Sequence, residues 1–144
     1  MNTAEWLKLL LRVYGAVLLL AIPAIALPFD WMNAIHQWLG MGELPRVPIV
    51  SYLARTTSVL FALFGGVTLM IATDIKRYWP FVTFWAIANL ALGGVSLAID
   101  LTIPMPLWWT LEEGPVLIGV GCLTLWMQKT AKVEIDAEPD TSQS

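Results

Sequence analysis

Charged side chains are scarce in this sequence, and their scarcity excludes an ordinary soluble fold. Asp, Glu, Lys and Arg make up 13% of the 144 residues, and 58% of the residues are hydrophobic. A typical soluble domain carries about 25% charged residues. The length fits one domain. The composition therefore predicts a small integral membrane protein, and it shows no basic surface of the kind that binds nucleic acid.

Cysteine and histidine are almost absent, with one residue of each type, Cys122 and His36. A single cysteine excludes an internal disulfide and a cysteine-cluster metal site. A single histidine cannot supply a pair of haem ligands. We expect His36 to be a solvated residue, with pH sensing as the alternative, and we expect no metal site. No nucleophile–base pair or phosphate loop occurs, which favours a protein that is not an enzyme; the sequence names no cofactor.

Long apolar runs dominate the rest of the chain. A transmembrane helix needs about 20 mostly apolar residues, and four stretches meet this length, at about 5–28, 48–73, 80–103 and 106–127. Proline stands at or near the start of the last three, where its missing N–H costs nothing. The sequence therefore predicts an all-α membrane protein. Residues 1–128 are expected to form an antiparallel four-transmembrane-helix bundle.

Two further segments have a different character. In 31–39, apolar residues including Trp31, Ile35 and Trp38 recur at helical spacing, preceded by Asp30 as N-cap and followed by Gly40. This pattern predicts a short interfacial helix on the outer membrane surface. Residues 129–144 are acidic and poor in apolar side chains. They are expected to be a disordered cytoplasmic tail.

The Lys and Arg distribution predicts the orientation. The basic residues of one side outnumber those of the other: Lys8, Arg12, Lys76, Arg77, Lys129 and Lys132 against Arg46 and Arg55. Cytoplasmic segments carry the excess, so both termini should be cytoplasmic. A cleavable signal peptide is the alternative, because residues 23–26 resemble a signal-peptidase site. The long apolar stretch and Arg12 within it argue against cleavage.

Four charged residues fall at membrane depth. A fourth helix starting at Pro115 would be only about 21 Å long, too short for a core of about 30 Å, so Pro115 should lie inside a kinked helix. Glu112 and Glu113 then lie about 10 Å below its start, and Arg55 lies about 10 Å from Pro48. Asp100 is nearer the outer end of the third span. We expect these charges to share the outer half of the bundle.

The predicted cluster is Arg55, Asp100, Glu112 and Glu113. Unpaired charges in a membrane are costly, so Arg55 should pair with one glutamate. Two interpretations stay open: a structural ion pair between helices, or a site for a ligand or ion. Tryptophans on the same outer face form either an aromatic rim that binds an organic cation or an ordinary interfacial belt; they are Trp31, Trp38, Trp108 and Trp109. Trp85 lies deeper.

Two of the predicted spans contain weakly similar runs, which we call the internal echo. The run FGGVTLMIATD from Phe64 resembles LGGVSLAID from Leu92. Adjacent glycines permit close helix approach, so we interpret both runs as packing faces. A true repeat with a binding site between related halves would need more matching residues.

Three runs resemble a group of uncharacterised small bacterial four-span inner-membrane proteins: HQWLGMGELPRVPIVSYLART, DIKRYWP and AIDLTIPMPLWWTLEEGP. The resemblance implies a bacterial plasma-membrane protein and transfers no activity. The layout is also distantly similar to DoxX-like proteins, some of which accompany quinone-linked oxidoreductases. We expect a protein that binds a small molecule, lipid or ion in an outward-facing polar pocket. The alternative is a structural or accessory subunit of a larger membrane complex. The expected partners are the lipid bilayer and either such a complex or a second copy of the chain.

Overall fold

All regular structure in the described part of the chain is helical. The computed structural model describes residues 2–103 and 105–137, with side chains up to residue 133. The helices are α1 (Thr3–Leu19), α2 (Ile22–Ala26), α3 (Phe29–Trp38), α4 (Pro48–Ile71), α5 (Trp79–Asp100) and α6 (Leu107–Ala137). The predicted all-α class is thus confirmed.

A proline separates α1 from α2. Pro23 lies in the first turn of α2. Its ring would clash with the carbonyl of Leu19, four residues earlier, and it lacks the N–H that would bond there. The chain therefore breaks at Leu20 and Ala21 and then continues as a helix.

Three helical stretches are long and apolar enough to cross a membrane. They are Thr3–Ala26, Pro48–Ile71 and Trp79–Asp100. The longer α6 is not among them, because Glu112 and Glu113 in its first half and polar residues in its second half lower its hydropathy. Its start at Leu107 nevertheless places Pro115 inside the helix, as the length argument predicts.

The predicted disordered tail is wrong for residues 129–137, because α6 continues to Ala137. Extending an existing helix adds one hydrogen bond for each residue fixed. Packing also favours the extension, since Gln128 is only 5% exposed and Ala131 is fully buried. The rest of the predicted tail, residues 138–144, lies outside the described residues.

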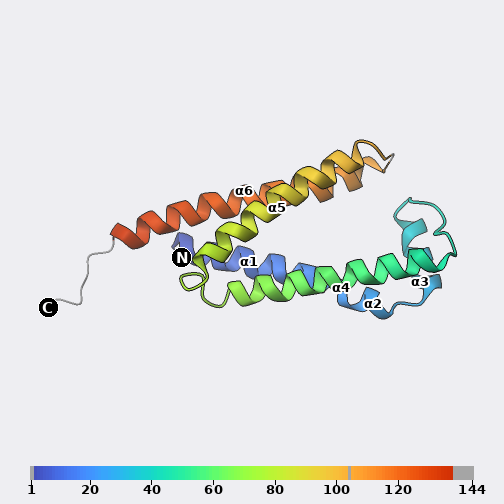
Figure 1. Cartoon of the computed structure of the whole chain (residues 1–144), viewed down its shortest axis with the longest axis horizontal. Helices are drawn as coiled ribbons and strands as arrows, with labels where there is room; N and C mark the ends of the chain where they lie inside the picture. Colours follow the sequence, from blue (N-terminus) through green and yellow to red (C-terminus); the bar gives the residue numbers. More distant parts are fainter. Residues whose placement is uncertain (1, 104, 138–144) are drawn as a thin grey trace.

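The long helices form two pairs. In the first pair α1 packs along α4, with α2 continuing against α4, and in the second pair α5 packs along α6. Contact between α1 and α6 joins the pairs, whereas α4 and α5 contact each other much less. Figure 1 shows the pairs meeting near the start of α1 and diverging toward α3. We call these the closed end and the open end of the bundle.

Glycines set the close approach within each pair. A Cβ built on Gly65 would lie 2.8 Å from the Gly15 carbonyl oxygen, and one built on Gly93 would lie 2.7 Å from the Gly114 carbonyl oxygen. The two GG runs therefore each supply one glycine to a helix contact. They face different partners, α1 and α6, which agrees with the packing interpretation of the internal echo.

The buried core lies toward the closed end. Its largest fully buried hydrophobic side chains are Leu7, Leu11 and Val82, from α1 and α5. Outward faces of the helices are apolar and exposed, as with Leu63 at 62%, Phe84 at 70% and Val95 at 57%. A helix that is apolar on its outer face as well is typical of a membrane span.

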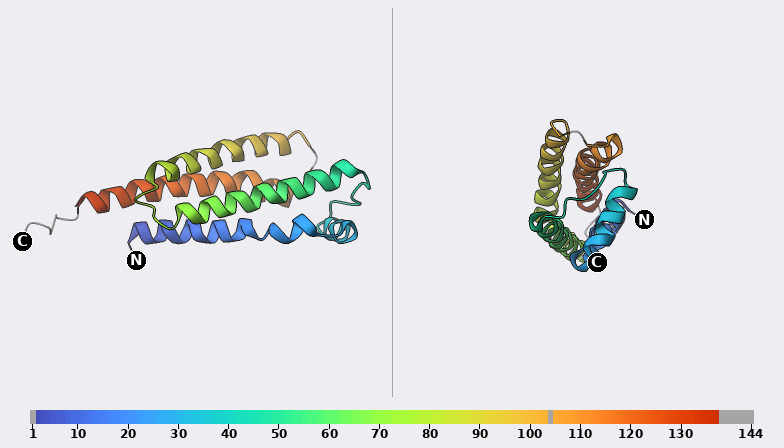
Figure 2. Two further views of the ribbon diagram at one scale, coloured as in Figure 1. Left: turned by 60° about the horizontal axis from the view of Figure 1, so that its bottom comes forward. Right: turned by 90° about the vertical axis from the view of Figure 1, so that its right-hand side faces the viewer.

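At the open end, α3 lies across the bundle axis (Figure 2). The predicted helix at 31–39 is present, but Asp30 is not its N-cap: α3 begins at Phe29, with Pro28 in the capping position. Asp30 forms an ion pair with Arg46 of the following loop instead. Gly40, which has φ of +77°, follows the last residues of the helix, in the position predicted for the residue that ends it.

Candidate functional site

A cavity of about 440 Å³ lies between the two helix pairs and is lined by all four long helices. We call it the interpair cleft. Most of its wall is apolar, with Leu60, Phe61 and Phe64 from α4 facing Leu92 from α5. Polar side chains contribute at particular points, among them Tyr14, Ser96, Glu112 and Glu113. The predicted polar pocket is therefore better described as an apolar cleft that carries carboxylates.

Glu113 is held in place by two donors. The Trp109 indole N–H donates to Oε2 at 2.8 Å, and the Ser96 hydroxyl donates to Oε1 at 3.3 Å. Trp109 and Glu113 are one helical turn apart on α6, so their side chains meet. Ser96 reaches across from α5 because Gly93 and Gly114 bring the two backbones together. The glycine contact thus positions the carboxylate.

Glu112 differs from its neighbour. It also lines the interpair cleft but is exposed. Within the described chain it has no hydrogen bond or ion pair. Adjacent residues on a helix point about 100° apart, so the two glutamates present their carboxylates differently. Glu113 is the fixed carboxylate and Glu112 is the free one.

Arg55 does not join the carboxylates. It is exposed and donates to the Leu27 carbonyl at 3.3 Å. Among the residues that the structure describes, no ion pair links it to Asp100, Glu112 or Glu113. The reason is helical direction: Thr57 lines the cleft, and a residue two positions earlier points about 200° away. Depth alone does not specify this direction around the helix.

Asp100 also lies outside the cleft lining. It is the last residue of α5 and is partly buried. Its Oδ2 atom is buried and has no hydrogen-bond partner within the described residues. The structure therefore brings Glu112 and Glu113 together and leaves the other two predicted members apart.

The predicted aromatic rim is likewise divided. Only Trp109 lines the interpair cleft. Trp108 packs edge-on against Trp109, with ring centroids 5.6 Å apart. Trp31 and Trp38 lie on α3 and are 66% and 84% exposed. For these two residues the interfacial-belt interpretation fits better than a role in the cleft.

A buried polar chain that sequence reasoning missed lies beside the cleft. The Tyr14 hydroxyl donates to Asn89 Oδ1 at 3.1 Å, Asn89 Nδ2 donates to the Trp85 carbonyl at 2.8 Å, and Trp85 Nε1 donates to Thr68 Oγ1 at 2.9 Å. Tyr14 also meets the Trp85 ring edge-on at 5.2 Å. These bonds connect α1, α4 and α5. The available signal is the presence of polar residues inside apolar spans, and of these four residues only Trp85 entered the prediction, for its depth.

No family model matches the chain, and neither a curated protein nor a solved structure matches it. Within the described residues, no group of three or more His, Cys, Asp or Glu side chains could hold a metal ion.

Proposed function

We propose that this chain is a four-span membrane protein that binds a small amphipathic cation in the interpair cleft. The apolar body of the ligand would lie against Phe61 and Phe64, and its cationic group would lie at Glu112 and Glu113. One observation carries the proposal: the cleft is lined by two carboxylates and by no Lys, Arg or His. Its negative charge therefore has no positively charged partner in the lining.

The chemistry of the lining supports a cation. An acidic side chain at the centre of a membrane helix costs about 2.5 to 3.5 kcal/mol, and the two donors to Glu113 offset only part of such a cost. A bound cation would offset more of it. Trp109, Phe61 and Phe64 add aromatic faces, which attract cations. The cleft volume of about 440 Å³ also falls within the range of small-molecule sites.

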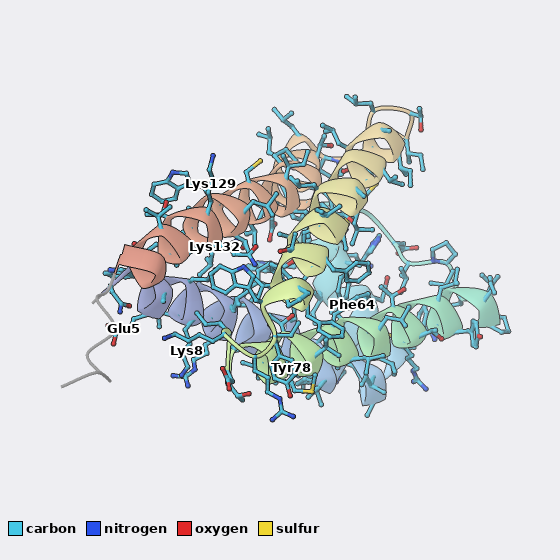
Figure 3. The ribbon with its side chains drawn as sticks, turned by 60° about the vertical axis from the view of Figure 1, so that its left-hand side comes forward. Glu5, Lys8, Phe64, Tyr78, Lys129 and Lys132 are labelled. Atoms are coloured by element: carbon cyan, nitrogen blue, oxygen red, sulfur yellow. The ribbon has the colours of Figure 1, made fainter. Side chains whose placement is uncertain are left out.

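The proposed topology takes α6 as the fourth span. It packs along α5 and has a length of 31 residues. Figure 3 shows Lys8, Lys129 and Lys132 gathered toward the closed end. Lys and Arg concentrate on the cytoplasmic side, so the closed end and both termini would be cytoplasmic. With the resemblance to small bacterial four-span proteins, this favours an inner-membrane protein whose cleft faces outward.

The experiment is a thermal-shift series on the full chain in detergent. The probes are the cation tetraphenylphosphonium and its neutral analogue of the same shape, tetraphenylmethane. The cation should raise the midpoint of unfolding, and the neutral analogue should not. Glu113→Gln should abolish the shift while the protein still folds. Glu43→Gln is the matched control, because Glu43 is exposed and lies outside the cleft.

Two results would contradict the proposal. One is equal stabilisation by the cation and the neutral analogue. The other is a cation-dependent shift that survives in the double variant Glu112→Gln/Glu113→Gln. Reduced expression of Glu113→Gln alone is separated from lost binding by measuring the unliganded unfolding midpoint of each variant.

A further inference from the structure

A second cavity, of about 420 Å³, lies at the open end of the bundle. We call it the end cavity. Its lining consists of His36, Gly40, Met41, Met105 and Pro106. The first three residues belong to α3 and its following loop, and the last two precede α6. The end cavity shares no lining residue with the interpair cleft, so it is a separate site.

The histidine in this cavity has a defined tautomer. His36 Nδ1 lies 2.8 Å from the Gly42 carbonyl oxygen. A carbonyl oxygen only accepts, so Nδ1 carries the proton, and Nε2 of the neutral ring keeps a free lone pair. Metal-binding histidines show the same arrangement, with one ring nitrogen donating to a carbonyl and the other facing the metal.

Two methionines supply soft donors beside this imidazole. Met41 and Met105 are both partly buried, and a thioether side chain is flexible enough to adapt to a ligand. Thioether and imidazole ligands select soft transition metals, Cu(I) in particular, whereas carboxylates and carbonyls suit Mg²⁺ and Ca²⁺. No carboxylate lines the end cavity. The donor set therefore discriminates against hard cations.

We propose that His36, Met41 and Met105 bind a Cu(I) ion through Nε2 and the two Sδ atoms. The loop backbone brings His36 and Met41 close together, and Met105 lines the same cavity. Gly40 and Gly42 have φ of +77° and +80°, which glycine adopts without strain. They fold the loop back on α3, where the Met41 N–H donates to the His36 carbonyl at 3.1 Å.

The position of the site means that a bound ion would connect two parts of the fold. His36 and Met41 are connected to the first helix pair, and Met105 is connected to the second. At the open end these pairs diverge (Figure 1). A Cu(I) ion held by all three residues would join the two pairs across that end.

The experiment titrates the full chain with Cu(I) under reducing conditions, in competition with a Cu(I)-selective chelator. All variants are made on Cys122→Ala, because Cys122 is an exposed thiol that would itself bind a soft metal. One ion per chain is expected. Met41→Leu and Met105→Leu should each weaken binding by at least the roughly 10- to 100-fold typical of an altered metal-site shell. Met70→Leu, on exposed α4 surface, is the matched control.

A second measurement tests the ligand atom. His36 is the only histidine, so ¹⁵N-labelled histidine reports on one ring. Addition of Ag(I), a redox-inert analogue of Cu(I), should shift the Nε2 resonance and leave Nδ1 protonated. The proposal is overturned if both Met→Leu variants bind like the parent, if binding disappears with Cys122, or if Nε2 does not respond.

Discussion

The two ends of the bundle are held together by different kinds of interaction. At the closed end the pairs are joined by buried side chains and by the polar chain through Asn89 and Trp85. At the open end the pairs diverge, and the chain is fixed by polar contacts between α3 and its loop, such as the part-buried bond in which Asn33 Oδ1 accepts from Leu44 N–H at 2.8 Å. Segments with few buried contacts open at lower free energy. The open end should therefore be the adjustable part.

The two ends of the bundle differ in the contacts between the helix pairs and not in the contacts within each pair. The glycine contact of Gly93 with Gly114 lies toward the open end of the second pair, and the contact of Gly15 with Gly65 lies in the first. Each pair is thus closely packed on its own. The structure consists of two closely packed pairs joined at one end by buried contacts, and the cleft lies between the pairs where such contacts are fewer.

The largest predicted effect comes from breaking the contact within a pair. In Gly93→Ala the added Cβ would lie 2.7 Å from a backbone oxygen of α6 and 2.9 Å from the Leu117 Cβ. Backbone atoms cannot rotate away, so α5 and α6 must separate. Overpacking of this kind costs about 1 to 3 kcal/mol. Reversible unfolding in mixed micelles would measure the loss.

Gly94→Ala is the matched control for this variant. No atom lies within 4 Å of a Cβ built there, and a substitution away from packed features typically changes stability by less than about 0.5 kcal/mol. Equal losses of stability in the two variants would show that the effect arises from replacing a glycine within α5 and not from the contact between helices.

The next effect tests the joint between the pairs. Asn89→Ala removes the acceptor of the Tyr14 hydroxyl and the donor to the Trp85 carbonyl. Hydrogen bonds between membrane helices average about 0.6 kcal/mol and reach about 1.7 kcal/mol, so we expect a loss in the upper part of this range. Tyr14→Phe, which keeps the ring against Trp85, completes a double-mutant cycle. Fully additive losses would mean that Tyr14 and Asn89 are not coupled.

The helices themselves were predictable because their signals are local. The expected spans 48–73 and 80–103 correspond to α4 (Pro48–Ile71) and α5 (Trp79–Asp100). An apolar run of sufficient length, with proline near its start, contains this information. The end of α3 at Gly40 was predictable for the same reason, because a positive φ favours glycine wherever the rest of the chain lies.

Which face each residue presents could not be predicted. The predicted depth of Arg55 matched that of Glu113, but depth does not define direction around a helix. The usual guide to direction is a polar face opposite an apolar one, and a membrane helix that is apolar on most sides lacks it. The role of Asn89 was hidden for the same reason. Asp30 shows a different limit, since a distant residue, Arg46, competed with its local capping role.

A substitution at Arg55 distinguishes the predicted ion pair from the observed contact, and we expect its effect on stability to be smaller. Breaking a buried ion pair costs about 3 to 5 kcal/mol. The exposed Arg55 instead makes one 3.3 Å bond to the Leu27 carbonyl, so Arg55→Gln should cost less than about 1 kcal/mol. The double variant with Glu113→Gln should be additive to within about 0.5 kcal/mol, as for independent sites. Chemical unfolding of the four proteins measures the coupling, and a larger value would restore the predicted pair.

The smallest global effect should come from the loop at the open end. The side chains of Asp30 and Arg46 are 73% and 71% exposed, and exposed ion pairs contribute about 0.2 to 1 kcal/mol.

The Asn33→Ala variant tests the same loop. It removes the acceptor for the Leu44 N–H, so exchange of that amide should accelerate while global unfolding stays near that of the parent. Hydrogen exchange and unfolding measured on the same sample test both parts. If Asn33→Ala instead lowered global stability as much as Gly93→Ala, the open end would unfold only together with the helix pairs, and its treatment as a separately adjustable region would be wrong.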